Sequence, residues 1–471
     1  MRPIPIKDVV KAVNGTVLHG ADISGAKIYC VAIDSRKDLF NGLFVPLKGE
    51  RNDGHDFIAR AFENGALCSF TERDSVDIPG GILIKVDSTN EALKMLAEYY
   101  MTLFSIPVVA ITGSSGKTTT KELIASVLAM KYKVLKTEGN YNNEIGLPLT
   151  VFNIDDSTEC AVLEMGMNNA GEIHNLSKIG KPDICIITNI GVAHIMNLGS
   201  REGILKAKSE IFDYMKPGGL AVLNGGDTML AAVKPRLKNV ITFGFGNEND
   251  VYADDVSSKG LDGVDFVLKS KDISTPISMK TFGKHAVLNA LVAAAIGLKL
   301  GVPMTDIKKT LEAFEPPAMR SSVIKGLDNK LTIVNDAYNA NPDSVCAAID
   351  VLSEVKGIRA CILGDMGELG NFSESMHKEV GEYVAKACIE HVICVGDADK
   401  AGNIYKAVKS VYAEYFDKFV YYFATQDEML EKLPAIICEG NTVWVKASRS
   451  AGLEKTVAAL TEMKLGSRDV L

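Results

Sequence analysis

The sequence predicts an α/β protein built from three domains. Its 471 residues exceed what a single hydrophobic core organises, so two to four domains are expected. From about residue 105 onward, β-like runs alternate with helical runs, which is typical of a mostly parallel sheet covered by helices. Proline-containing segments interrupt this pattern at 105–107 and 315–317. We therefore expect domains at 1–104, 105–315 and 316–471, with hinges at the two interruptions.

The elements follow in order along the chain. Up to about residue 104, short strands and turns are predicted, ending in a helix at about 90–100. In the second segment the runs VVAIT, CAVLEMG, DICIITNIG and LAVLN read as strands, while TKELIASVLAM and KAKSEIFDYM read as helices. An Ala- and Leu-rich helix at 286–298 is expected to close this domain. The third segment repeats the alternation but contains no G-x-G-x-x-G, so no dinucleotide site is predicted there.

Composition excludes several classes of protein. Hydrophobic residues make up 47% and charged residues 23%, which is ordinary for a globular protein. A net charge of −8 argues against a binder of nucleic acid or of anionic membranes. No apolar run reaches about 18 residues, and the start MRPIPIKDVV lacks the apolar core of a signal peptide. Nine scattered cysteines without a C-x-x-C pair suggest reduced thiols. We expect a cytoplasmic protein without membrane insertion.

The stretch VVAITGSSGKTTTKELIASVL, residues 108–128, predicts a phosphate-binding loop. A buried strand leads into a glycine-containing turn, and an apolar stripe at 123–128 places a helix start near Lys117. This strand, loop and helix context is what G-x-x-x-x-G-K-[ST] requires, although Ile111 occupies the position of its first glycine. The residues of this loop that we expect to bind ATP are Gly113, Ser114, Ser115, Gly116, Lys117, Thr118 and Thr119.

The chemistry of such a loop follows from its residue types. The glycines let backbone N–H groups converge on a phosphate at a helix N-terminus, where the helix dipole also favours an anion. Lys117 can reach the β- and γ-phosphates, and the Thr118 hydroxyl can ligate Mg²⁺. The alternative is a glycine-rich turn that simply enters a helix.

Two further residues, Glu164 and His194, are candidates for the metal side of the site. An ATP site needs an acid at the end of a neighbouring strand, and Glu164 ends the CAVLE run. His194 follows the next strand in ITNIGVAHI, although a lone histidine is more often structural. Lys208 in LKAKSEIF reads, on its residues alone, as a surface lysine on a helix. A solvated strand-end acid remains the alternative for Glu164.

Two later stretches also place polar residues together. His285 and Asn289 are four residues apart, so they share one face of a helix. In IVNDAYNANPDS, Asp336 ends a strand and Tyr338 follows it, and we interpret both as functional. Asn341 before Pro342 is typical of a helix N-cap, which favours a structural role for that residue.

The shortened loop T-G-S-S-G-K-T resembles that of the Mur ligase and folylpolyglutamate synthetase superfamily. AIDSRKDLFNGLFVPLKGERNDGHDF in the first segment resembles the UDP-binding domain of the Mur ligase family and argues against the folate enzyme. TEGNYNNEIGLP, EMGMNNAGEI, NDAYNANPDS and LGDMGELG resemble the branch that adds D-alanyl-D-alanine to UDP-N-acetylmuramoyl-tripeptide, and the D-N-P-R motif of another branch is missing. The resemblance spans nearly the whole chain and implies a UDP-binding domain, a central P-loop domain and a Rossmann-like C-terminal domain.

The resemblance also implies roles for individual residues. Lys208 stands where the family carries a lysine carbamylated by CO₂, which binds a second Mg²⁺. Arg320 stands where an arginine reaches the γ-phosphate, with Met319 in place of the usual glycine. Ala286 stands where the family usually has an asparagine. The catalytic residues would be Lys117, Lys208, His194 and Arg320, and the metal ligands would be Thr118, Glu164, His194 and Lys208. The other contacts to the nucleotide would be His285, Asn289 and Asp336. The contacts to the substrate would be Ser35, Asn140, Asn142, Asn143 and Tyr338.

The activity implied by the resemblance is ATP-dependent, ADP-forming amide bond formation through an acyl phosphate, in peptidoglycan precursor synthesis. It requires ATP, two Mg²⁺ ions, UDP-N-acetylmuramoyl-tripeptide and D-alanyl-D-alanine, and we expect a monomer. The sequence leaves open whether the tripeptide carries lysine or diaminopimelate, and it fixes neither the oligomeric state nor the strictness of dipeptide selection. The alternatives are another Mur-type ligase, a folylpolyglutamate synthetase, a P-loop ATPase or kinase acting as a switch, and a non-catalytic nucleotide-binding scaffold.

Overall fold

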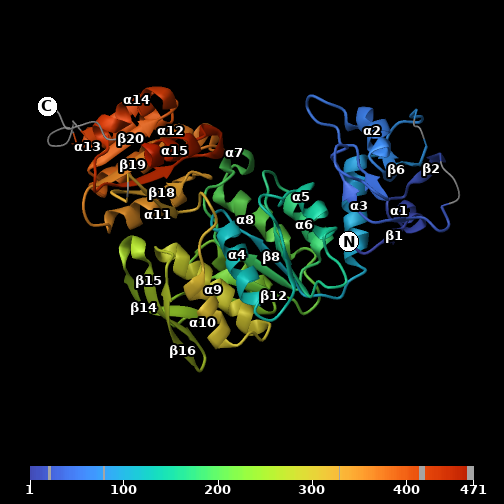
Figure 1. Ribbon diagram of the computed structural model, residues 1–471. Coiled ribbons are helices and arrows are strands. Elements are labelled where there is room, and N and C mark those ends of the chain that lie inside the picture. The colour runs from blue at the N-terminus through green and yellow to red at the C-terminus, as the bar shows by residue number, and fades with distance from the viewer. Residues whose placement is uncertain (20–22, 78–79, 328, 413–418, 464–471) are drawn as a thin grey trace. The chain divides into compact units, whose positions relative to one another are not determined.

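The computed structural model describes residues 1–19, 23–77, 80–327, 329–412 and 419–463, and it has the α/β fold that the sequence predicts. Each of the three predicted segments contains a mainly parallel sheet with helices packed against it (Figure 1). In the described residues, no helix has both the length and the apolar composition that a membrane crossing requires.

The first segment contains a five-stranded sheet in the order β2-β7-β6-β5-β4, of which only the β2–β7 pair is antiparallel. A separate pair joins β1 to β3. The strands are β1 (Ile4–Pro5), β2 (Thr16–His19), β3 (Lys27–Ile28), β4 (Val31–Ala32), β5 (Gly42–Phe44), β6 (Ala66–Thr71) and β7 (Ile82–Lys85), and the helices are α1 (Ile6–Ala12), α2 (Ile58–Glu63) and α3 (Thr89–Met101). Helix α3 confirms the helix expected at 90–100.

Helix α3 is tied firmly to residues that follow the predicted hinge at 105–107. Glu98 forms ion pairs with Lys178 at 3.4 Å and with Lys181 at 3.0 Å, and Lys94 forms one with Glu144 at 3.1 Å. These ion pairs join α3 to residues that follow it in the chain, and the hinge at 105–107 stays a prediction.

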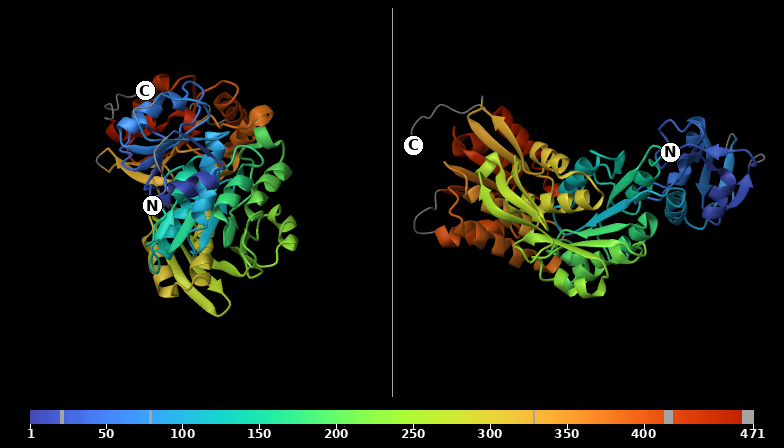
Figure 2. Two further views of the ribbon diagram at one scale, coloured as in Figure 1. Left: turned by 90° about the vertical axis from the view of Figure 1, so that its right-hand side faces the viewer. Right: turned by 90° about the horizontal axis from the view of Figure 1, so that it is seen from below.

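The second segment forms a nine-stranded sheet in the order β16-β15-β14-β13-β12-β11-β8-β10-β9. Its strands are β8 (Val108–Thr112), β9 (Val134–Lys136), β10 (Cys160–Glu164), β11 (Ile184–Ile187), β12 (Leu220–Asn224), β13 (Val240–Phe245), β14 (Val251–Ser258), β15 (Val264–Ser270) and β16 (Ile273–Met279). Strands β8, β10 and β11 are buried throughout, as their continuous apolar runs predict. The antiparallel pairs β14–β15 and β15–β16, visible as long yellow-green arrows in Figure 2, lie in a region that sequence analysis had left unassigned.

The helices of this segment are α4 (Lys117–Leu128), α5 (Gly146–Val151), α6 (Glu172–Gly180), α7 (Ile195–Leu198), α8 (Arg201–Ser209), α9 (Lys284–Lys299) and α10 (Met304–Ala313). Helix α4 begins at Lys117, as predicted. The helix expected at 286–298 is α9, but it does not close the segment because α10 follows it. The run KAKSEIFDYM is helical only in part, since α8 ends at Ser209 and a 3-10 turn covers Glu210–Phe212.

The third segment forms a six-stranded sheet in the order β17-β18-β22-β19-β20-β21, in which only β17 runs antiparallel to its neighbour. Its strands are β17 (Ser322–Gly326), β18 (Leu331–Asp336), β19 (Arg359–Gly364), β20 (His391–Val395), β21 (Val420–Phe423) and β22 (Thr442–Lys446), and its helices are α11 (Pro342–Ser353), α12 (Ser373–Lys386), α13 (Ala401–Tyr412), α14 (Gln426–Ile436) and α15 (Glu454–Glu462). Asn341 caps α11 by accepting the Ser344 N–H at 2.9 Å, which confirms its predicted structural role.

By packing, the chain separates into two compact units. The first comprises Met1–Thr112, Leu128–Ile186 and Lys208–Ala221, and the second comprises Gly113–Val127, Ile187–Ala207 and Val222–Leu471. The phosphate loop and the C-terminal sheet thus belong to the second unit, whereas Glu164 and Lys208 belong to the first. The domain boundaries at 104/105 and 315/316 stay a prediction.

Candidate active site

The phosphate loop leaves β8 and enters α4 with both of its glycines in conformations that other residues rarely adopt. Gly113 has φ 153° and Gly116 has φ 77°. A Cβ on Gly113 would lie 1.8 Å from the Thr188 hydroxyl oxygen, so the position accepts no side chain. Lys117 Nζ donates to the Gly113 carbonyl at 2.8 Å and folds back over the loop. The loop therefore has the shape and the cation that its sequence predicts.

Asn189, just after β11, braces the loop. Its carbonyl accepts the Ser114 N–H at 3.0 Å, and its side-chain Oδ1 accepts the Ser115 N–H at 3.0 Å. The Ser115 carbonyl in turn accepts the Thr188 hydroxyl at 2.7 Å. Because these two serine amides donate within the protein, we expect a phosphate to be bound by the amides nearer the start of α4.

The two residues predicted to contact adenine lie on α9 but differ in their surroundings. Asn289 is buried, and its Oδ1 accepts the Thr120 hydroxyl at 2.9 Å, which joins α9 to α4. The His285 side chain is exposed near the start of the same helix. The structure thus gives Asn289 a structural contact and leaves His285 accessible to a ligand.

Arg320 and Tyr338 are brought together in the C-terminal segment. The guanidinium carbon of Arg320 lies 4.1 Å from the centre of the Tyr338 ring, and that of Arg449 lies 5.9 Å from the same ring. Such stacking holds a guanidinium in place without neutralising it. Met319, which stands where the family has glycine, has φ 62°, so this backbone keeps the conformation that glycine adopts easily.

Asp336 is engaged with a lysine that sequence analysis did not single out. Its Oδ2 lies 2.7 Å from Lys446 Nζ, and its Oδ1 accepts the Ser321 N–H at 3.2 Å. Lys446 is buried at the end of β22, in register with Asp336 on β18, and also donates to the Asn339 carbonyl at 3.1 Å. The pair fixes the end of the C-terminal sheet, and a nucleotide contact by Asp336 stays a prediction.

His194 caps α7 in the left-handed conformation, with φ 64°. Its Nδ1 lies 2.7 Å from Oε2 of Glu368, a residue of the C-terminal segment. A second acid of that segment, Asp343, accepts the Val192 N–H at 3.2 Å. His194 is therefore part of a group of contacts that sequence analysis did not foresee.

In the first unit, Glu164 ends β10 as predicted, paired in register with Ile111 of β8, the residue before the last one of that strand. The Glu164 side chain is buried, and its Oε1 accepts the Asn142 amide at 2.7 Å. Its backbone N–H donates to the Thr137 hydroxyl at 2.9 Å. A buried, braced carboxylate does not fit the alternative of a solvated strand-end acid.

Lys208 differs from the surface lysine that its residues alone suggest. It lies near the end of α8 with only 1% of its surface exposed. Burying an ammonium group costs several kcal/mol unless the charge is compensated or removed. The carbamylation that the resemblance implies stays a prediction.

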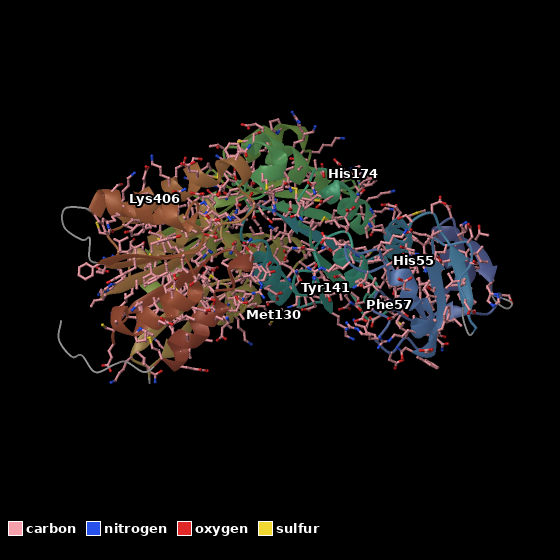
Figure 3. All side chains as sticks on the ribbon, turned by 90° about the horizontal axis from the view of Figure 1, so that it is seen from above. His55, Phe57, Met130, Tyr141, His174 and Lys406 are labelled. Atoms are coloured by element: carbon pink, nitrogen blue, oxygen red, sulfur yellow. The ribbon has the colours of Figure 1, made fainter. Side chains whose placement is uncertain are left out.

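The loop between β9 and α5 carries the three asparagines predicted to contact the substrate. Asn143 accepts the Gly146 N–H at 2.8 Å and so starts α5, while Asn142 braces Glu164. Asn140 is exposed, and so is the neighbouring Tyr141, which is labelled in Figure 3. Ser35 is buried in the first segment, where its carbonyl accepts the Asn64 amide at 2.7 Å.

Few side chains in the described residues are placed to act as Mg²⁺ ligands. No group of three or more His, Cys, Asp or Glu side chains in the described residues is placed to hold a metal ion. Mg²⁺, however, commonly takes one or two carboxylates and completes its shell with water and substrate phosphates. The buried Glu164 carboxylate is an oxygen donor of the kind that such an ion takes.

Asn189, Asp343, Glu368 and Lys446 are the site residues that sequence analysis missed. Lys446 carried a usable signal, since it ends the apolar run TVWV as Asp336 ends LTIVN. Asp343 follows the Asn341–Pro342 helix start, where an acid is ordinary. Asn189 and Glu368 lie within motifs, but no sequence pattern indicates which residues they contact.

Known families match each of the three segments. The Mur ligase family catalytic domain matches residues 27–101, the Mur ligase middle domain matches 111–297, and the Mur ligase glutamate ligase domain matches 319–449. The order agrees with the predicted three-domain fold, and the matched ranges include the phosphate loop, Lys208 and Arg320.

Curated relatives and solved structures cover nearly the whole chain. The UDP-N-acetylmuramoyl-tripeptide–D-alanyl-D-alanine ligase of Bacillus subtilis is 39% identical over 98% of this chain and 99% of its own length. The ligase of the same name from Escherichia coli is 33% identical over 98% and 99%. A crystal structure of MurF from Acinetobacter baumannii, 32% identical, superimposes with a TM-score of 0.89 over 98% of this chain and 100% of that chain.

A second solved structure adds a nucleotide. MurF from Thermotoga maritima in complex with ADP is 30% identical and has a TM-score of 0.81 over 92% of this chain and 97% of that chain. Since the likeness runs from the first strands to the last helix and the phosphate loop has its expected form, the chain belongs to the Mur ligase family and, within it, to the MurF type.

Proposed function

We propose that the chain is a cytoplasmic, ADP-forming ligase that joins D-alanyl-D-alanine to UDP-N-acetylmuramoyl-tripeptide, a step of peptidoglycan precursor synthesis. The observation that carries the proposal is the phosphate loop, with Lys117 folded over it, in a chain whose relatives of that name align from end to end. All nine cysteines lie in the described residues and none forms a disulfide, which agrees with a reducing compartment.

The mechanism follows from charge. The tripeptide carboxylate must attack the γ-phosphate of ATP, and both groups are anions. Lys117 at the loop and Arg320, held against the Tyr338 ring, supply fixed cations that offset this repulsion and the charge that develops during transfer. The carboxylate oxygen bonds to the γ-phosphorus and ADP leaves. The dipeptide amine then attacks the acyl phosphate carbon, and phosphate leaves as the amide forms.

Metal ions would join this site together with ATP. Thr118, Glu164 and His194 would hold one Mg²⁺, and carbamylated Lys208 would hold a second. Bound Mg²⁺ neutralises charge on the phosphates. Asn142 holds the Glu164 carboxylate in a fixed orientation, which is the usual role of a hydrogen bond behind a metal ligand.

The remaining predicted contacts belong to the substrates. His285 is exposed and free to lie against the adenine, with Asn289 supporting its helix and Asp336 on the nucleotide side. Ser35, Asn140 and Asn143 would contact the UDP-N-acetylmuramoyl-peptide, and Tyr338 would lie on the dipeptide side. We propose the domain boundaries 1–104, 105–315 and 316–471 and a monomeric enzyme.

The test is phosphate and ADP release from ATP with each substrate withheld in turn. We expect release only when UDP-N-acetylmuramoyl-tripeptide and D-alanyl-D-alanine are both present, with D-alanyl-D-lactate and single amino acids far poorer as acceptors. Tripeptides ending in lysine and in diaminopimelate should be compared. ADP release that needs neither substrate would identify a switch ATPase, and ATP binding without any turnover would identify a scaffold.

A further inference from the structure

Two acids from the C-terminal segment hold the loop at residues 189–196, which carries His194. Glu368 contacts it twice, because its Oε2 lies 2.7 Å from His194 Nδ1 and its carbonyl accepts the Met196 N–H at 3.2 Å. Asp343 contacts it through Oδ2, which accepts the Val192 N–H at 3.2 Å. Side chain and backbone of the loop are thus both fixed from a part of the chain far away in sequence.

The backbone at this contact is strained and tightly fitted. His194 and Glu368 have φ 64° and 63°, a conformation that costs a non-glycine residue about 1 kcal/mol or more. A Cβ on Gly370 would lie 2.8 Å from Met196 Cγ, and one on Gly191 would lie 2.1 Å from Asp343 Oδ2. Such strain persists only where surrounding contacts determine the conformation, and here the two acids supply those contacts.

The same loop is bonded to the phosphate loop on its other side. The Gly191 N–H donates to the Ser114 hydroxyl oxygen at 2.9 Å, and Asn189 accepts the amides of Ser114 and Ser115. Residues 189–196 therefore link the phosphate loop to two carboxylates of the C-terminal segment. A carboxylate repels a phosphate, so Asp343 and Glu368 are unsuited to binding the nucleotide directly.

The chemistry of the imidazole suggests what the acids do. A histidine that ligates a metal through one ring nitrogen is commonly oriented by a carboxylate at the other nitrogen. Glu368 lies 2.7 Å from Nδ1 as an ion-pair contact, so the nitrogen of His194 that would ligate a metal is Nε2. Asp343 fixes the same loop two residues earlier, at Val192, and so limits how far His194 can swing.

We propose that Asp343 and Glu368 are positioning residues, which orient His194 so that the C-terminal segment sets the affinity for the ATP-bound metal ion. The proposal rests on the proposed function, since it takes His194 as a metal ligand. It adds that this ligand works only while the C-terminal contacts are made, and metal binding therefore reports the docking of that segment.

The experiment measures Mn²⁺ binding to the ADP-bound full-length protein by electron paramagnetic resonance of free Mn²⁺. Glu368→Gln, which keeps the size of the side chain and removes its charge, should weaken Mn²⁺ binding by about 10-fold or more. ADP binding without metal should stay within about twofold, because the phosphate loop is untouched. Asp343→Ala should weaken Mn²⁺ binding more than Asp343→Asn, which retains an acceptor for Val192.

A matched control and a double mutant separate positioning from general damage. Glu374→Gln removes the same charge from an exposed position in the first turn of α12 and should leave Mn²⁺ binding unchanged. In a His194→Ala background, Glu368→Gln should have no further effect, because its action passes through the imidazole. Unchanged Mn²⁺ affinity in Glu368→Gln, an equal loss of metal-free ADP binding, or a full additional effect without His194 would each overturn the proposal.

Ligation by the wild-type protein is measured on the same preparation. A wild-type protein that ligates normally while Glu368→Gln binds Mn²⁺ normally defeats the positioning role alone. The wild-type protein could instead fail to ligate, while Mn²⁺ binding weakens in Glu368→Gln and not in Glu374→Gln. That result would contradict the proposed reaction and leave the positioning role intact.

Discussion

The phosphate loop and the loop at 189–196 meet at Ser114, yet they are held in opposite ways. The phosphate loop turns through its own residues, since its glycines permit the turn and Lys117 bonds back to Gly113 four residues earlier, and Asn189 braces it from outside. The loop at 189–196 owes its shape to partners far along the chain, Asp343 and Glu368. The conformation of the phosphate loop is encoded in a contiguous motif, whereas the conformation of residues 189–196 depends on contacts that form only when the chain folds.

This difference predicts how substitutions act. Changes in the phosphate loop should alter nucleotide binding and chemistry directly. Changes at the remote partners should act through the orientation of one side chain, with smaller effects that depend on the metal. The predictions below are ordered by decreasing expected effect.

Lys117→Ala should give the largest effect. It removes a fixed cation from a site that must bring two anions together, and turnover should fall roughly 1,000-fold or more. The loop glycines are unaffected, so thermal unfolding should resemble that of the wild type. Steady-state ADP release measures the turnover, and circular dichroism measures the thermal unfolding. A well-folded variant with near-normal turnover would contradict the assignment of the ATP site.

Lys208→Ala should be nearly as damaging, because it removes the side chain that we expect to become an anionic metal ligand. Added short-chain carboxylates should restore part of the activity by filling the space it leaves. Lys206→Ala, at an exposed position on the same helix, is the matched control and should be close to wild type. An unmodified amine at Lys208 in crystals grown at alkaline pH with bicarbonate would count against the carbamate.

Gly113→Ala should lower stability as well as nucleotide affinity. The added methyl group would lie 1.8 Å from the Thr188 hydroxyl oxygen, so the loop or strand β11 must shift. We expect a loss of about 2 kcal/mol or more, from overpacking and strain together. Gly171→Ala is the control, since Gly171 has φ 91° but open space at its Cβ, and it should cost only the strain. Equal effects of the two substitutions on thermal unfolding would refute the steric explanation.

The parts of the fold that depend on short-range pattern could be predicted from the sequence. Helix α4 begins at Lys117, β10 ends at Glu164 and Asn341 caps α11, because a strand run, a glycine turn and an N-cap each act over a few residues. The buried environment of Lys208 was not predicted, and the family resemblance implied only its carbamylation. Its own helix carries several charged neighbours, and what covers it comes from elsewhere in the fold.

The missed features depend on long-range contacts. Strands β14 to β16 pair as antiparallel neighbours, yet stretches such as ADDVSS in β14 are too polar to read as strands. Glu368 stands between two glycine-containing steps of LGDMGELG, where no periodicity points to His194. Lys446 and Asp336 are paired only because β22 lies beside β18, an order that follows from the topology and not from proximity in sequence.

The smallest expected effect concerns pH and the support behind Glu368. His377 is fully buried, its Nε2 accepts the Met366 N–H at 3.0 Å, and its Nδ1 contacts the Ser373 carbonyl at 2.7 Å. Burial lowers the pKa of His377 below its ordinary value of 6.5, so the neutral ring is the form that fits the fold. Through its hydrogen bond with the Met366 N–H, this ring fixes the backbone two residues before Glu368.

The sign of the pH effect follows from linkage. Because the folded pKa lies below the unfolded one, the unfolded chain binds the proton more readily, and the contribution of His377 is complete above about pH 6.5 and lost as the pH falls through the folded pKa. The wild type should lose more thermal stability between pH 7.5 and 5.5 than His377→Gln, by at most about 1.4 kcal/mol per pH unit. Parallel pH profiles of thermal stability for the two proteins would show that the neutral His377 ring does not support the fold in this way.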